Sequence, residues 1–240
     1  MATLLLEDLV KVYNNKMTVD HVTMEVASGA VTGLLGPNGA GKTTTFYMAV
    51  GMIQADGGKV LLDGRDLTDD PMYVRARKGL GYLPQESSVF GKLSVRDNIM
   101  AILEVGRLSR SGREKKAAGL MDELGISRLA DRKAYLLSGG ERRRLEIARA
   151  LATEPLFMLL DEPFAGIDPL AVIDISNIIK HLTERGIGVL ISDHSVRETL
   201  KVCDTAYILN HGAVIESGSP EKIASSEVAK RFYLGEGFTL

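Results

Sequence analysis

The sequence predicts an α/β fold in which helices cover both faces of a largely parallel β-sheet. Short apolar runs recur along the chain, and most are separated by segments whose apolar residues have helical spacing. One run, residues 31–35, leads into a glycine-rich turn that is followed at once by a helical segment. The middle third lacks a convincing strand, so we expect a helical lobe inserted into the α/β core.

The composition is typical of one globular domain, residues 1–240. Hydrophobic residues make up 45% of the 240 and charged residues 25%, which argues against a disordered chain. The net charge of −2 gives no electrostatic footprint for nucleic acid, so we expect no such partner. Cys203 is the one cysteine, which favours a reducing, cytoplasmic location. No apolar run suits a signal peptide or approaches the ~18 residues of a membrane span, so we expect membrane contact only through partners.

Strands are expected first in the N-terminal third and then at intervals toward the C-terminus. Segments with β-branched residues or leucine, bounded by glycine or Asp-Gly turns, lie at residues 3–13, 19–29 and 57–67. Apolar runs predict buried strands at residues 79–84, 156–163, 186–194 and 206–212. Apolar residues at helical spacing lie at residues 94–108, 113–126 and 140–152. We therefore expect a core of residues 1–90 and 153–240 and a helical lobe of residues 91–152.

Residues 36–43, GPNGAGKT, match the phosphate-loop pattern G-x-x-x-x-G-K-[ST] between a predicted strand and a predicted helix. Glycines let successive N–H groups face a phosphate chain, Lys42 supplies positive charge, and the Thr43 hydroxyl suits Mg²⁺. A chance glycine-rich turn is the alternative, and the flanking strand and helix argue against it. The predicted nucleotide-binding residues are Gly36, Pro37, Asn38, Gly39, Ala40, Gly41, Lys42, Thr43 and Thr44.

Two acidic residues, Asp161 and Glu162, end the apolar run that begins at residue 156. At the carboxyl end of a strand beside a phosphate loop, Asp161 is placed to hold Mg²⁺. Glu162 is placed to act as general base on the attacking water. A helix cap for the segment after Pro163 is the alternative for such an acid pair, and the phosphate loop favours the catalytic role.

Four further residues are weak signals alone and gain meaning from their order. Tyr13 ends the first predicted strand, where its ring could stack on a purine, Gln85 and His194 follow later strands, and Asp168 lies in AGID. The sequence LSGGE stands at residues 137–141. Phosphate loop, strand-end glutamine, LSGGE, strand with Asp-Glu, and strand-end histidine is the motif order of the ABC-type ATPases. The chain resembles that family over essentially its full length.

The resemblance implies a RecA-like P-loop NTPase core, an antiparallel β arm carrying Tyr13 and an inserted helical lobe carrying LSGGE, which is the fold of an ABC nucleotide-binding domain. It implies a head-to-tail homodimer in which LSGGE of one subunit covers the ATP held by the other. The residues expected to act in trans are Ser138, Gly139, Gly140, Glu141 and Asp168.

The same resemblance assigns roles in hydrolysis. It implies that Glu162 polarises the water, His194 holds the γ-phosphate, and Lys42 with Mg²⁺ offsets developing charge. The cofactors implied are ATP and Mg²⁺. The residues expected at the metal are Thr43, Gln85 and Asp161.

The LSGGE segment has a second interpretation, because Ser138 and Glu141 fit a capping box for the helix that follows. A cap needs no Gly-Gly pair, and glycine costs about 1 kcal/mol against alanine inside a helix, so we favour the site shared between subunits. The arginines at residues 142–144 are expected to form a solvated helix face. No aromatic residues interleave them, which argues against nucleic-acid contact.

Several segments look most like the ATP-binding subunits of bacterial lipopolysaccharide exporters within the resembled family. They are GKTTTFYMAVG, RARKGLGYLPQESSVFGKLSVRDNI, FAGIDPLAVIDI and FYLGEGFTL. A subunit of a branched-chain amino-acid importer is the first alternative, and a soluble ABC assembly ATPase is the second. An exporter motor would act with two transmembrane subunits at the inner face of the bacterial inner membrane.

Two segments outside the nucleotide motifs are candidates for partner contact. Membrane partners are expected near residues 85–93, with Phe90 as an apolar anchor, and the alternative is that Phe90 caps the core. The resembled family often has a basic residue after this phenylalanine, and Gly91 stands here, so the sequence does not support a charged contact there. The C-terminal aromatic residues pack either on the other subunit or on their own core. They are Phe232, Tyr233 and Phe238.

Overall fold

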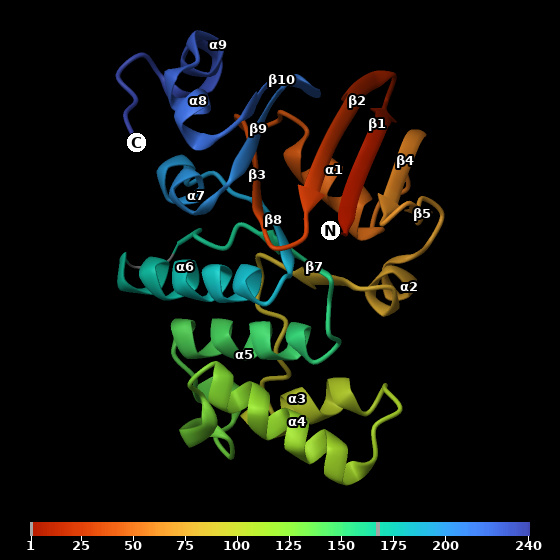
Figure 1. Cartoon of the computed structure of the whole chain (residues 1–240), viewed down its shortest axis with the longest axis vertical. Coiled ribbons are helices and arrows are strands. Elements are labelled where there is room, and N and C mark those ends of the chain that lie inside the picture. The colour runs from red at the N-terminus through yellow and green to blue at the C-terminus, as the bar shows by residue number, and fades with distance from the viewer. Residues whose placement is uncertain (1, 167–168) are drawn as a thin grey trace.

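The computed structural model describes residues 2–166 and 169–240, and a six-stranded sheet forms its centre (Figure 1). The strand order is β10-β9-β3-β8-β7-β6, and every pair is parallel except the β9–β10 hairpin. The strands are β3 (Val31–Leu35), β6 (Leu80–Leu83), β7 (Phe157–Asp161), β8 (Gly188–Ser192), β9 (Thr205–Asn210) and β10 (Ala213–Gly218). The predicted largely parallel sheet is confirmed, and the edge strand β10 was not expected.

A second, antiparallel sheet forms the predicted β arm, with strand order β2-β1-β4-β5. Its strands are β1 (Thr3–Tyr13), β2 (Lys16–Ala27), β4 (Gly57–Leu62) and β5 (Arg65–Asp66). Tyr13 pairs with Lys16 at the tip of the β1–β2 hairpin. The backbone N–H of Asp20 in β2 donates to the carbonyl of Gly212 at 2.9 Å, which ties the arm to the turn after β9.

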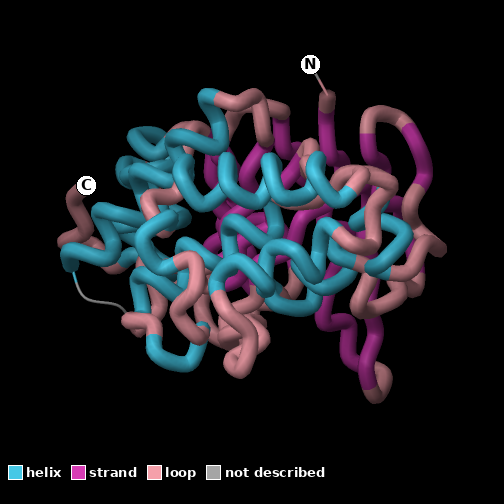
Figure 2. The backbone as a smooth tube through the Cα atoms, turned by 90° about the horizontal axis from the view of Figure 1, so that it is seen from below, coloured by secondary structure: helices cyan, strands magenta, loops and turns pink. Residues whose placement is uncertain are grey.

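Helices cover the large sheet on both faces. They are α1 (Lys42–Val50), α2 (Met72–Arg77), α3 (Val95–Leu103), α4 (Arg110–Glu123), α5 (Gly139–Leu151), α6 (Pro169–Glu184), α7 (Val196–Val202), α8 (Pro220–Ser225) and α9 (Glu227–Ala229). Helices α3, α4 and α5 lie together below α6 in Figure 1, and the view from below shows helices stacked in front of the strands (Figure 2). Within the described ranges, no helix has the length and apolar character needed to cross a membrane.

The large sheet separates two main hydrophobic clusters, as the alternation along β7 shows. Phe157 and Leu159 pack with α1 and the β arm on one face. Met158 and Leu160 pack with α6 and the lobe helices on the other face. Because successive side chains of a strand point to opposite faces, a strand buried on both sides reads as one continuous apolar run.

The expectation that arginines 142–144 form a solvated helix face is wrong. Arg143 Nη1 donates to the carbonyl of Pro84 at 3.0 Å, and Arg144 Nη2 donates to Asp174 at 2.6 Å. Arg142 Nη2 donates to the carbonyl of Leu137 at 3.2 Å. Long side chains reach acceptors beyond their own helix face, so these residues tie the lobe to itself and to the core.

Arg75 on α2 connects this helix to the C-terminal end of α1. Its side chain is buried, with 2% exposure, and burial lowers the pKa of the guanidinium. The guanidinium donates to four backbone carbonyls at 2.7–2.8 Å, those of Met48, Ala49, Thr68 and Asp70. The carbonyls of Met48 and Ala49 belong to the last turn of α1, where a cation also offsets the helix dipole.

We expect Arg75→Met to lower the free energy of unfolding by about 3 kcal/mol, because it removes one buried donor that four backbone carbonyls share. The melting midpoint should fall by roughly 6–12 °C. Arg77→Met, on the exposed side of the same helix, is the matched control and should change the midpoint little. Thermal unfolding of both variants checks the prediction, and equal midpoints would contradict it.

Candidate functional site

The glycine-rich loop after β3 is shaped by close backbone approaches. Gly36 has φ +148°, and a Cβ there would lie 2.2 Å from the carbonyl oxygen of Leu209. Gly41 has φ +102°, and a Cβ there would lie 2.6 Å from the carbonyl oxygen of Thr18 in β2. Neither position accepts a side chain, so the loop can curl tightly against β9 and the β arm.

Lys42, the first residue of α1, lies over this loop. Its Nζ donates to the carbonyls of Gly36 at 2.6 Å and Pro37 at 3.0 Å. Burial lowers the pKa of Lys42, and the nearby carboxylates of Glu162 and Asp193 act in the opposite direction. The ammonium is therefore held at the loop and faces acidic groups, as a phosphate-binding lysine would.

The rest of the loop leaves room for a ligand. Asn38, Gly39 and Thr43 are exposed, Pro37 and Thr44 are half-buried, and Ala40 is buried. Tyr13 and Thr18 belong to the same β1–β2 hairpin, and the Thr18 carbonyl approaches Gly41 of the loop. Tyr13 is 43% exposed, and the Lys11 ammonium lies 5.4 Å from the centroid of its ring.

Three residues predicted from separate motifs meet at one edge of the sheet. Gln85 Nε2 donates to Glu162 Oε2 at 2.6 Å, and His194 Nδ1 lies 3.4 Å from the same oxygen. These residues follow β6, β7 and β8, which are neighbours in the parallel sheet, so their carboxyl ends coincide. The structure thus brings together the glutamine, glutamate and histidine.

Asp161 lies at the same edge but is buried. Burial, together with the charges of Glu162 and Asp193, raises its pKa to about 6, and the Tyr82 hydroxyl donates to it at 3.5 Å. Crowded carboxyl groups of this kind suit a divalent cation, which would remove the mutual repulsion. Nowhere in residues 2–166 or 169–240 do three His, Cys, Asp or Glu side chains form a metal site of their own.

Asp193 is a site residue that the sequence analysis missed. It is fully buried, and its two carboxylate oxygens accept the backbone N–H groups of Phe164 at 2.8 Å and Ser195 at 2.7 Å. It therefore fixes the turn after Glu162 to the turn that carries His194. Its position directly before His194 was the one available signal.

The LSGGE segment forms the N-terminus of α5. Ser138 Oγ accepts the N–H of Glu141 at 3.3 Å, and Glu141 Oε2 accepts the N–H of Ser138 at 3.0 Å. The capping box is therefore present. Ser138 and Gly139 are exposed, and Gly139 lines a small cleft together with Gln85 and Glu162. Asp168, predicted to act beside this segment, lies outside the described residues.

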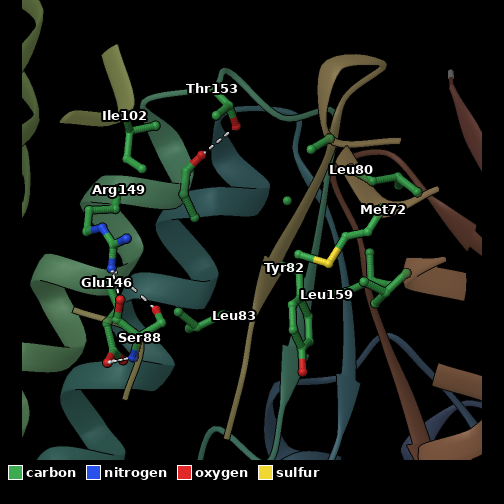
Figure 3. A pocket seen from close by; sticks show the side chains of 14 residues that line it. Met72, Leu80, Tyr82, Leu83, Ser88, Ile102, Glu146, Arg149, Thr153 and Leu159 are labelled. Carbon is green, nitrogen blue, oxygen red and sulfur yellow. Dashed lines mark hydrogen bonds between the residues drawn. The ribbon is translucent and has the colours of Figure 1, made fainter. Parts of the chain in front are cut away.

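A groove lies between the lobe and the core (Figure 3). Its walls are apolar side chains of α2 and β6 on one side and Ile102 and the end of α5 on the other. The Arg149 guanidinium lines the groove and lies 4.6 Å from the centroid of the Phe90 ring. The ring is 47% exposed, so Phe90 does not cap the core as the alternative interpretation held.

Buried Asn98 fixes the backbone of Phe90. Asn98 Oδ1 accepts the Phe90 N–H at 2.8 Å, and Asn98 Nδ2 donates to the Phe90 carbonyl at 3.1 Å. A Cβ at Gly91 would meet only the Tyr135 Cβ, at 3.7 Å, so the position has space for a side chain. The exposed ring is thus held by a rigid backbone.

Comparisons with known proteins show what the chain as a whole is similar to. Residues 19–165 match the family model described as ABC transporter. The lipopolysaccharide export system ATP-binding protein LptB of Escherichia coli strain K12 is 55% identical over 100% of both chains. The protein of that description from Haemophilus influenzae is 53% identical, again over 100% of both chains.

Solved structures give the same fold. The ADP conformation of MJ1267, an ATP-binding cassette of an ABC transporter, superposes with a TM-score of 0.88 at 30% identity. That match covers 98% of this chain and 100% of the other. CbiO1 of Clostridium perfringens, part of an ABC transporter complex, gives a TM-score of 0.86 at 27% identity over 95% and 92% of the two chains.

Proposed function

Because this chain belongs to the ABC transporter family of ATP-binding proteins and is an ATPase, we propose that it powers the export of lipopolysaccharide from the inner membrane. The proposed transport substrate rests on one observation, the 55% sequence identity over the full length to an ATP-binding protein described as part of a lipopolysaccharide export system. The meeting of Gln85, Glu162 and His194 at the end of the parallel sheet supports the chemistry.

In the proposed hydrolysis, the phosphate loop and Lys42 bind the phosphates of ATP, and the Tyr13 ring stacks on the adenine. Glu162 accepts the proton of the attacking water, and His194 holds the γ-phosphate. Gln85 orients the Glu162 carboxylate through its 2.6 Å hydrogen bond. Thr43, Gln85 and Asp161 would hold Mg²⁺, which supplies positive charge to the phosphate oxygens.

The chain is proposed to work as a head-to-tail homodimer. The exposed Ser138, the N–H groups of Gly139 and Gly140 and the N-terminus of α5 form an anion-binding turn, and it would meet the γ-phosphate held by the other subunit. Glu141 supports Ser138 in the cap, and Asp168 would act at the same contact. ATP then favours the closed dimer, and hydrolysis releases it.

Two transmembrane subunits are the proposed partners, with this chain at the inner face of the inner membrane. The Phe90 ring and the apolar groove beside it offer a site for an apolar segment of such a subunit. Because Phe90 is half exposed on a fixed backbone, it can enter a partner's surface without a conformational change.

Affinity capture tests the cargo and Phe90 together. The tagged chain, with ATP and vanadate, is recovered from detergent-solubilised membranes, and the captured chains are identified. We expect two membrane subunits of a lipopolysaccharide exporter. Recovery of importer permeases would overturn the cargo, and a purely soluble set of partners would indicate an assembly ATPase.

In the same capture, we expect Phe90→Ala to lower recovery of the membrane subunits at least about tenfold, because the variant loses one central apolar contact with them. Leu156→Ala removes an apolar side chain of equal exposure, 47%, and serves as the control. Equal recovery with both variants would count against Phe90 as an anchor.

Glu162→Gln should lower the turnover number roughly 10²- to 10⁴-fold and leave ATP binding intact, because the amide cannot accept a proton from water. Glu154→Gln is a suitable control, since Glu154 also has a positive φ but lies on the surface. Steady-state hydrolysis and equilibrium ATP binding are measured for both. Near-normal turnover by Glu162→Gln would exclude the general-base role.

Ser138→Arg should abolish hydrolysis without emptying the phosphate loop, because the arginine blocks the turn that meets the other subunit's nucleotide. Ser109→Arg removes the hydroxyl that caps α4 and controls for loss of a cap, which costs about 1 kcal/mol. ATPase rate and ATP affinity are compared for the two variants. A fully active Ser138→Arg chain would refute the site between subunits.

A further inference from the structure

The C-terminal segment packs against the strand that leads into the phosphate loop. A π-helical turn, Lys230–Leu234, follows α9. Tyr233, Leu234 and Phe238 pack on a cluster that includes Leu35, the last residue of β3. Two interpretations of the C-terminal aromatic residues were open, packing on their own core or on the other subunit. Tyr233 and Phe238 pack on their own core. Phe232, in contrast, is 49% exposed. The C-terminal segment therefore packs against the end of the strand from which the phosphate loop begins.

The hydroxyl of Tyr233 is buried at this point and has no hydrogen-bond partner among the described residues. Burial raises the pKa of the Tyr233 hydroxyl, an approach by the backbone N–H of Gly36 that falls short of hydrogen-bond geometry lowers it, and the Asp193 carboxylate raises it. The group is therefore a protonated donor that faces the first residue of the phosphate loop and the buried carboxylate beside His194.

A buried hydroxyl without a partner lowers the stability of the fold, whereas phenylalanine would bury the same ring without that cost. The stability of the nucleotide-free fold therefore does not explain why position 233 is tyrosine and not phenylalanine. The carbonyls at the start of the phosphate loop are the acceptors that nucleotide binding would free. Lys42 donates here to the carbonyls of Gly36 and Pro37, and a phosphate chain would draw the lysine away from both.

We propose that Tyr233 is a positioning residue for the phosphate loop. Its hydroxyl donates to the first turn of the loop, residues 36–37, once Lys42 has turned to the phosphates, and so holds the loop open for ATP. The inference rests on the proposed binding of ATP by this loop. It gives the C-terminal segment a role within its own subunit, independent of cargo and membrane partners.

Tyr233→Phe removes the hydroxyl alone, so it tests the proposal on the isolated chain. We expect the dissociation constant and KM for Mg-ATP to rise about two- to tenfold, the loss of one hydrogen bond, while kcat changes less than about twofold. The unfolding midpoint without nucleotide should stay equal or rise. Tyr207→Phe is the control, because the Tyr207 hydroxyl accepts the N–H of Glu25 at 3.2 Å, outside the site. It should leave ATP affinity unchanged.

Two results would overturn the proposal while leaving the proposed function intact. One is unchanged ATP affinity in Tyr233→Phe. The other is a lower unfolding midpoint with a parallel loss of affinity in both variants, which would make the hydroxyl merely structural. Failure of the unaltered chain to bind Mg-ATP would instead overturn the proposed nucleotide site, and the inference with it.

Discussion

The arrangement of the site depends on one backbone hydrogen bond, from the N–H of Glu162 to the carbonyl of Ser192 at 2.6 Å. Glu162 has φ +45°, a left-handed conformation that costs a residue with a side chain about 1–3 kcal/mol. This turn directly follows Asp161, the last residue of β7, and directs the Glu162 carboxylate to Gln85 and His194. Asp161 stays buried in the sheet. Two adjacent acids therefore have two environments, one buried and one at the edge of the sheet.

The sequence predicted which residues meet at the sheet edge better than it predicted the residues that hold this edge in place. Gln85, Glu162 and His194 were found because each ends an apolar run, and parallel strands carry their ends to one edge. Asp193 was missed because it acts by accepting two backbone N–H groups, and no spacing rule reveals such contacts. Arg75 was missed for a related reason, since all four of its acceptors are carbonyls of the main chain.

The arginines of α5 show where reasoning from helical spacing fails. The spacing places residues 142–144 correctly on a helix whose apolar side is Leu145 and Ala148, both buried. Helical spacing assigns charged residues to the solvent-facing side of a helix. An arginine side chain, however, is long enough to reach acceptors beyond its own helix face. The position of Pro84 and Asp174 as acceptors depends on how the lobe sits on the core, which is tertiary information.

Strand β10 was not predicted because all six of its residues are only half-buried, so the sequence shows no long apolar run there.

The same helix joins the proposed partner groove to the nucleotide edge. Glu146 Oε1 accepts the Ser87 hydroxyl at 2.7 Å and the Ser88 N–H at 3.2 Å, while Arg149 donates to the Ser88 carbonyl. The segment between Gln85 and Phe90 is therefore fastened to α5, whose N-terminus is the LSGGE turn. In the proposed transporter, a partner that displaced this segment would act on Gln85 and on α5 through these hydrogen bonds. The proposed partner groove and the nucleotide edge are thus joined by hydrogen bonds within a single subunit.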